Sequence, residues 1–239
     1  MKSPKRLARF AGVLYLLVGI FGALAEGFME PKMYVAGNAA ATAGNVVANA
    51  GLVRMGVVAD LLDGAFFVFT ALALYMLLKD VHKSAARAML VFVALAAAIT
   101  CFSAVFEFEG LRVATGGVNA AALGIGGSNA VVLLLLDAQH YALLTAQIFF
   151  GLWLAPLGYL AYKSGWFPRT LGLLLVAASA CYLVDMLAAF LVPGFDQKIH
   201  ALIVVPCAIA EIWMVLYLLV VGVKAVKPER RILAAQLAS

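Results

Sequence analysis

Seven ionisable side chains lie inside apolar stretches of this chain, and their types could bind a cation, relay a proton or hold a metal ion. They are Asp60, Asp63, Asp137, His140, Asp185, His200 and Glu211. Carboxylates and imidazoles are costly in hydrocarbon, so within membranes they usually face a protein interior or a water-filled cavity. The pattern predicts a polar pocket with His200 at its entrance and a lining of Asp60, Asp63, His140, Asp185 and Glu211.

The two histidines widen the range of chemistry. His140 and His200, with a carboxylate such as Asp185, could hold a zinc ion that activates water. The same histidines could instead ligate haem axially. The sequence has no HExxH or other compact ligand spacing, no phosphate-binding loop and no nucleophile elbow. Zinc and haem therefore stay open without being favoured, and the sequence does not decide whether the protein is an enzyme.

Some polar residues also have a simpler interpretation. Glu26, Glu107 and Asp137 lie near the ends of apolar stretches, where they can be solvated. Asp60 could be a structural acid paired with Arg54, which would lower the cost of burying it. The three cysteines, Cys101, Cys181 and Cys207, show no CxxC spacing, and we expect them to be small buried hydrophobes.

The elements that must position these residues are transmembrane helices. The chain is 66% hydrophobic and 12% charged, whereas soluble domains carry about 25% charged residues. Runs of roughly 20 apolar residues predict six spans, at about 8–28, 54–78, 87–107, 132–161, 169–192 and 199–223. Backbone groups must be paired in lipid, and these runs lack the two-residue alternation of barrel strands. We therefore expect an all-α integral membrane bundle of six helices, with residues 1–239 forming one domain.

The basic residues predict the orientation of the bundle. Of the 17 Lys and Arg residues, all but Lys32, Arg54, Arg112 and Lys198 fall in segments on one side. The positive-inside rule then places both termini in the cytoplasm, and the candidate site residues in the extracytoplasmic half. The expected location is a bacterial cytoplasmic membrane, where the basic ends meet anionic headgroups of the lipid bilayer. We do not expect these charges to form the single folded face that nucleic-acid binding needs.

Three segments outside the central spans have their own signals. Basic residues 2–9, an apolar run from Phe10 and the sequence Ala23-Leu24-Ala25 resemble a cleavable signal peptide, but five further spans favour an ordinary first helix. Residues 29–53 predict a short surface helix capped by Asn38. Residues 108–131 are rich in glycine and predict a flexible loop.

One run of residues carries a resemblance to a known family. It extends from Phe150 through Gly151-Leu152-Trp153-Leu154-Ala155-Pro156-Leu157-Gly158-Tyr159 to Leu160, and continues with Lys163-Ser164-Gly165-Trp166-Phe167-Pro168-Arg169 and Leu171-Gly172. The segments Ala8–Tyr15 and Asn38–Ala59 are similar too. The chain resembles the bacterial multi-pass membrane proteins grouped as domain of unknown function 4386. This resemblance implies the membrane architecture and no activity, and the run excludes both His140 and His200.

The sequence thus predicts a membrane protein that binds or moves a small molecule or cation. The alternatives are a metal-dependent intramembrane hydrolase of a lipid-like substrate, a haem-binding protein and a non-catalytic assembly protein. In the hydrolase, His140 and His200 would hold the metal, and Asp60, Asp63 or Asp185 would complete its shell. Neither the ligand nor the oligomeric state follows from the sequence.

Overall fold

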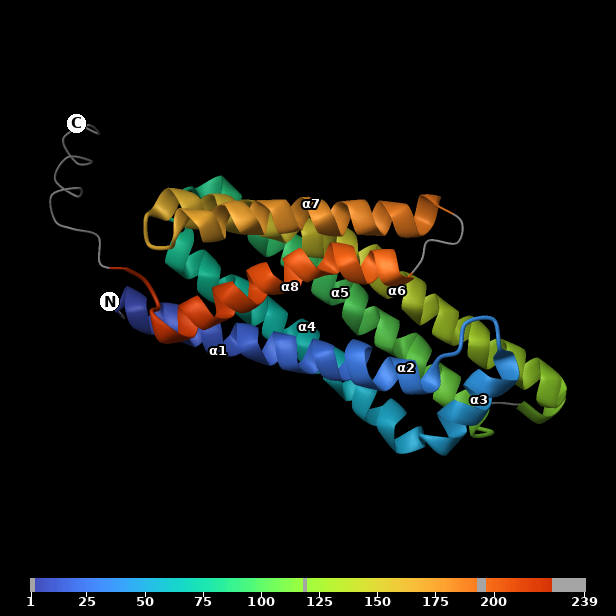
Figure 1. The fold of residues 1–239 in the computed structure, drawn as a ribbon. Helices are drawn as coiled ribbons and strands as arrows, with labels where there is room; N and C mark the ends of the chain where they lie inside the picture. The colour runs from blue at the N-terminus through green and yellow to red at the C-terminus, as the bar shows by residue number, and fades with distance from the viewer. Residues whose placement is uncertain (1–2, 118–119, 193–196, 225–239) are drawn as a thin grey trace, which may run out of the picture. The chain divides into compact units, whose positions relative to one another are not determined.

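The computed structural model describes residues 3–117, 120–192 and 197–224, without the side chains of 120, 121, 197–201 and 204. Within these ranges every regular element is helical, which confirms the all-α prediction. In chain order (Figure 1) the elements are α1 (Pro4–Gly22), the π-helix η1 (Ala23–Met29), α2 (Glu30–Met33), α3 (Ala39–Ala48), α4 (Ala50–Leu78), α5 (Lys83–Ala114), α6 (Ala120–Ser164), α7 (Arg169–Leu191) and α8 (Gln197–Val220).

Five helical runs in the described chain are long and apolar enough to cross a membrane. They are Pro4–Met33, Ala50–Leu78, Lys83–Ala114, Ala122–Ser164 and Arg169–Leu191. These runs coincide with the first five predicted spans, so the protein is a multi-pass helical membrane protein. The sixth predicted span falls on α8, whose described apolar part, Val205–Val220, is shorter than 18 residues. A sixth crossing and the cytoplasmic placement of the termini stay predictions.

The glycine-rich loop predicted at 108–131 is wrong. Residues 108–114 continue α5 and residues 120–131 already belong to α6. A glycine inside a helix costs only about 1 kcal/mol relative to alanine, so the alanines and leucines between the glycines keep the segment helical. The helical backbone is interrupted at Gly124, which has φ 66° and ψ 170°. Glycine adopts this conformation without the strain that a β-carbon would cause.

The first span continues past its predicted end at residue 28 through a π-helix. η1 is seven residues long, and the backbone N–H of Glu30 donates to the carbonyl oxygen of Ala25, five residues earlier. π-helical turns are rare and often occur at functional sites. The continuation to Met33 brings Glu30 into a segment that the hydropathy pattern had left outside the span.

The chain forms two compact units, each built partly from α1, α4, α5 and α6. Unit 1 consists of Met1–Val13, Thr70–Phe92 and Phe150–Ser239, and therefore holds all of α7 and α8. Unit 2 consists of Leu14–Phe69 and Val93–Phe149.

In unit 1, α6 and α7 pack backbone to backbone. A β-carbon added at Gly158 would lie 2.6 Å from the carbonyl oxygen of Gly172, and one added at Gly172 would lie 2.8 Å from that of Gly158. The turn that joins these helices contains Gly165 at φ 67°. Ser164 Oγ accepts a hydrogen bond from the N–H of Trp166 there. The segment Ser164–Arg169, part of the run that carries the family resemblance, is thus the connection of a closely packed helical hairpin.

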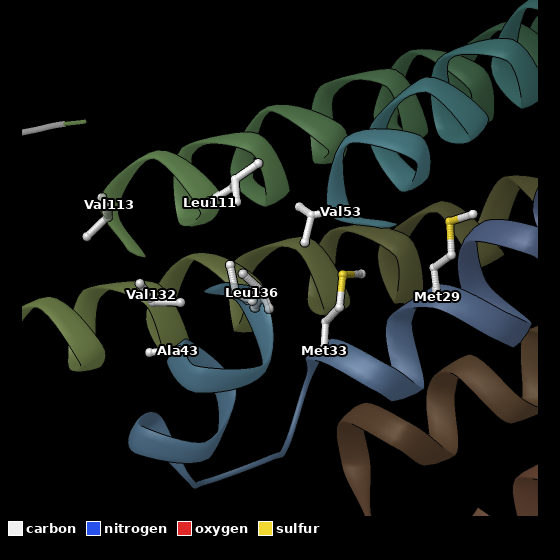
Figure 2. Close-up of a cluster of buried hydrophobic side chains, with 9 residues drawn as sticks. Met29, Met33, Ala43, Val53, Leu111, Val113, Val132 and Leu136 are labelled. Atoms are coloured by element: carbon white, nitrogen blue, oxygen red, sulfur yellow. The ribbon is translucent and has the colours of Figure 1, made fainter. Parts of the chain in front are cut away.

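In unit 2, an apolar cluster joins η1, α2, α3, α4, α5 and α6 (Figure 2). Its buried members are Met29, Met33, Ala43, Val46, Val53, Leu111, Val113, Val132 and Leu136. One of the helices in this cluster is α3. Asn38 caps its first turn, because Oδ1 of Asn38 accepts a hydrogen bond from the N–H of Ala41 at 3.0 Å. The predicted capped helix is confirmed. This cluster fixes the ends of the helices that carry the polar residues described next.

Candidate functional site

Unit 2 buries acidic side chains that leave an oxygen without a hydrogen bond to any described residue. Asp60 on α4 and Glu107 on α5 are each 2% exposed. The unpaired atoms are Oδ2 of Asp60 and Oε1 of Glu107. Arg54, the cation offered by the sequence as a partner for Asp60, is exposed and forms no ion pair with it. Burial without a partner is unfavourable for a charged carboxylate, so this arrangement needs compensation.

A glycine lets the carboxyl group of Glu107 lie directly against α4. A β-carbon added at Gly56 would lie 2.7 Å from Oε1 of Glu107. Gly56 is four residues before Asp60, so both positions share one face of α4. Asp63 continues this face, and its Oδ1 lies 3.6 Å from the β-carbon position of Gly22 on α1. The lack of a side chain at Gly56 thus brings two acids of different helices to the same region.

Other buried polar residues of α5 accompany Glu107. Thr100, Ser103 and Glu107 are all buried, and Ser103 Oγ donates to the carbonyl oxygen of Thr100 at 2.8 Å. The interpretation of Glu107 as a solvated residue near a helix end is wrong. The helix continues seven residues beyond it to Ala114, which moves Glu107 away from the end.

A second group of polar residues in unit 2 connects α2, and the residue that directly follows it, with α6. His140 Nδ1 and Glu30 Oε1 are 2.8 Å apart, and the hydroxyl of Tyr34 donates to Oδ1 of Asp137 at 2.6 Å. The rings of Tyr34 and His140 stack with centroids 5.4 Å apart. Burial, followed by the hydrogen bond to Asp137, raises the pKa of Tyr34 above its ordinary value. Tyr34 therefore stays protonated and serves as a donor.

The two polar groups of unit 2 lie within electrostatic range of each other. Glu30 interacts through space with both Asp60 and Glu107, and Glu26 of η1 interacts with Asp60, Glu30 and His140. We call Asp60, Glu107 and Glu30, with the adjoining Glu26 and Asp63, the acidic site of unit 2. Several like charges held this close favour uptake of a proton or another cation.

The predicted residues of unit 1 form a different set. The hydroxyl of Tyr182 on α7 donates to Oε1 of Glu211 on α8 at 2.8 Å, and Asp185, one turn after Tyr182, is fully buried. Of the three cysteines predicted to be buried, Cys207 is buried, whereas Cys101 and Cys181 are half-buried. The thiol of Cys207 donates to the carbonyl oxygen of Ala178 at 3.4 Å. Asp185 and Glu211 thus belong to the packed interface of α7 and α8.

The six predicted site residues are accordingly divided. Asp60, Asp63 and His140 lie in unit 2, and Asp185 and Glu211 lie in unit 1. The backbone of His200 belongs to α8, but its side chain is outside the described residues. In the described part of the chain, no three His, Cys, Asp or Glu residues are arranged to hold a metal ion. A single pocket lined by all six residues stays a prediction, as does a metal held by His140, His200 and Asp185.

Glu30 and Tyr34 were not among the site residues predicted from the sequence. A signal for them was present, because residues 26, 30 and 34 are spaced by four, a helical repeat. It was overlooked because the apolar run ends near residue 28. Their partners on α6 are 110 and 103 residues away in sequence, so no local pattern could have paired them.

Two hollows of unit 2, of about 380 and 410 Å³, lie apart from the predicted residues. They are lined mainly by small side chains such as Ala43, Gly44, Ala114 and Ser128. Neither includes one of the six predicted site residues.

The sequence of the chain is similar to a known protein family and to one protein of an archaeon. The model of the family described as "Domain of unknown function (DUF4386)" matches residues 10–222. A protein of Archaeoglobus fulgidus, described as "Uncharacterized protein", is 32% identical over 123 residues. This match covers 52% of the chain and 60% of the relative, so the chain spans less than two thirds of that protein. No solved structure matches. Because the family model covers most of its length, the chain belongs to the DUF4386 family.

Proposed function

We propose that the protein binds a small cation, a proton or an alkali ion, at the acidic site of unit 2. The observation that carries this proposal is the burial of Asp60 and Glu107, each with an oxygen that no described residue pairs. Taking a carboxylate out of water without a counter-charge is unfavourable by several kcal/mol. A bound proton or cation removes that penalty, and buried acids in membrane proteins commonly serve ion and proton pathways.

The orientation of the protein is part of this proposal. Thirteen of the 17 basic residues fall in segments that the positive-inside rule assigns to the cytoplasm of a bacterial cell. The acidic site then takes its cation from the extracytoplasmic half of the membrane. Such a site suits a transporter or a sensor component. The hydrolase alternative stays a prediction, because the side chain of His200, one of its metal ligands, is outside the described residues.

The test is thermal unfolding of the purified protein in detergent, at constant ionic strength, with sodium or potassium replaced by choline. A ligand that binds only the folded state at 100 times its Kd stabilises it by about 2.7 kcal/mol. The variants are Glu107→Gln and Asp60→Asn, which keep the shape of the side chain without its charge. The matched control is Glu109→Gln, two residues away on α5, because Glu109 is an exposed acid paired with Arg112 at 2.6 Å.

The proposal predicts that stabilisation by the alkali ion disappears in Glu107→Gln and Asp60→Asn but persists in Glu109→Gln. If the bound cation is a proton, no alkali ion stabilises the wild type. The unfolding temperature of the wild type then varies with pH over a range in which the unfolding temperature of Glu107→Gln stays constant. Equal responses of Glu107→Gln and Glu109→Gln to both pH and alkali ions would reject the site.

A further inference from the structure

The described basic residues of the chain are concentrated in unit 1. Nine Lys and Arg residues of unit 1 are described, all of them exposed, compared with three in unit 2. Among the described acids of unit 1, Asp80 is the exposed one. A membrane helix bundle that gathers positive charge without matching acids has a surface suited to an anionic partner.

Contacts between segments far apart in sequence hold this charge in one region of unit 1. Arg9 of α1 donates from Nη2 to the carbonyl oxygen of Val220 at the end of α8. The N–H of Lys224, just after α8, donates to the carbonyl oxygen of Trp166 in the turn between α6 and α7. The ring of His82, between α4 and α5, meets the ring of Tyr159 on α6 edge to face at 5.7 Å. The starts of α1, α5 and α7 therefore meet the ends of α4, α6 and α8.

Two cations at the turn between α6 and α7 are placed over aromatic rings. Nζ of Lys163 lies 6.0 Å from the ring centre of Tyr159, and Cζ of Arg169 lies 5.5 Å from that of Tyr162. All four of these side chains are exposed. Tyrosine is enriched at membrane–water interfaces, where its ring lies at headgroup level. A cation placed over such a ring is suited to contact the phosphates of lipid headgroups.

We infer that this region of unit 1, defined by Lys83, Arg87, Lys163 and Arg169 with Tyr159 and Tyr162, binds the phosphate headgroups of anionic phospholipids. Basic clusters beside membrane helices typically recognise such headgroups. The neighbouring helix starts favour the same partner, because the first turns of α5 and α7 contain no acidic residue. The dipoles of these two helices add positive potential at their starts, where a phosphate would lie. Arginine and lysine supply several donors for its oxygens.

The test titrates phosphatidylglycerol into detergent micelles of the full-length protein and follows the unfolding temperature. Phosphatidylcholine, which carries no net charge, is the comparison lipid. The test variant is Lys163→Gln with Arg169→Gln, and Lys83→Gln with Arg87→Gln is a second test on a different helix. The control is Lys32→Gln with Arg54→Gln, which removes two exposed basic residues of unit 2. Lys32 lies over the Phe28 ring at 3.4 Å, so the control also removes a cation placed over a ring.

Each basic residue near an anionic lipid surface contributes about fivefold in affinity, so losing two predicts an about 25-fold higher half-saturating phosphatidylglycerol content. We expect this shift in both test variants, no shift in the control, and a wild-type response that weakens at high salt. The inference is overturned if phosphatidylcholine stabilises the wild type equally, or if the control loses as much as the test variants. Stabilisation by inorganic phosphate alone, at the same concentration, would also overturn a lipid site.

Discussion

Replacing Gly158 by alanine should separate α6 from α7 and destabilise the protein. The new β-carbon would lie 2.6 Å from the carbonyl oxygen of Gly172, 2.9 Å from Cγ2 of Val176 and 3.0 Å from Cβ of Leu175. Ordinary contacts of this kind begin near 3.4 Å. The closest contact is with backbone, which cannot rotate away as the end of a flexible side chain can. The helices must therefore move apart by several tenths of an ångström.

The expected cost follows from two opposing effects. Overpacking of a close interface typically costs about 1–3 kcal/mol, and contacts this short with backbone belong to the upper part of that range. Alanine also favours the helix over glycine by about 0.5–1 kcal/mol, which offsets part of the loss. The net destabilisation should be about 2 kcal/mol. For a chain of this size that corresponds to an unfolding temperature lower by about 4–8 °C.

The assay is thermal unfolding in detergent, with Gly19→Ala as the control. Gly19 lies inside α1, is exposed, and a β-carbon there would meet nothing within 4 Å. Gly19→Ala should therefore leave the unfolding temperature unchanged or raise it. Gly172→Ala should behave like Gly158→Ala, and the double variant should lose less than the sum, because both residues contribute to one contact. If Gly158→Ala and Gly19→Ala unfold at the same temperature, the close approach of the two helices is refuted.

Three further substitutions test unit 2. Gly56→Ala places a β-carbon 2.7 Å from Oε1 of Glu107. The carboxyl group of Glu107 ends a flexible side chain and can move away at a cost of about 1 kcal/mol. We therefore expect the stabilisation by a cation or proton to be lost in the thermal-shift assay. Tyr34→Phe removes the 2.6 Å hydrogen bond to Asp137 and should destabilise by about 1–2 kcal/mol. The pKa of Tyr34 is raised in the folded state, so its contribution to the stability of the folded state is complete below pH about 10 and is lost as the pH rises further. Above this pH, the unfolding temperature of Tyr34→Phe should therefore fall less steeply than that of the wild type. Asn38→Ala removes the cap of α3 and should cost about 1 kcal/mol in chemical unfolding, and an unchanged midpoint would show that α3 does not depend on its cap.

Hydropathy located the membrane helices well but not where they end. The predicted third span, 87–107, lies within α5, which extends from Lys83 to Ala114. Transfer to hydrocarbon selects only the apolar middle of a helix, whereas lysine, arginine and glutamate propagate the helix into the interface at little cost. This difference changed the interpretation of Glu107, which is buried inside a longer helix and not solvated at the end of a shorter one. Glu107 is buried because α5 is longer than predicted and because its side chain lies on the face toward Gly56 of α4.

The run that carries the family resemblance contributes to packing and headgroup contacts, while the acidic site lies elsewhere in the sequence. Gly158 and Gly172, both in that run, make the close approach of α6 and α7 possible, and Gly165 supplies the positive φ of the turn between them. Glu107 lies against α4 at Gly56, one turn before Asp60, and Glu30 contacts His140, which is 110 residues away in sequence. Helical periodicity assigns each of these side chains to a face, but only tertiary packing determines which faces meet. For this reason the sequence predicted the candidate acids one by one, and the grouping of Asp60, Glu107 and Glu30 emerged only from the fold of unit 2.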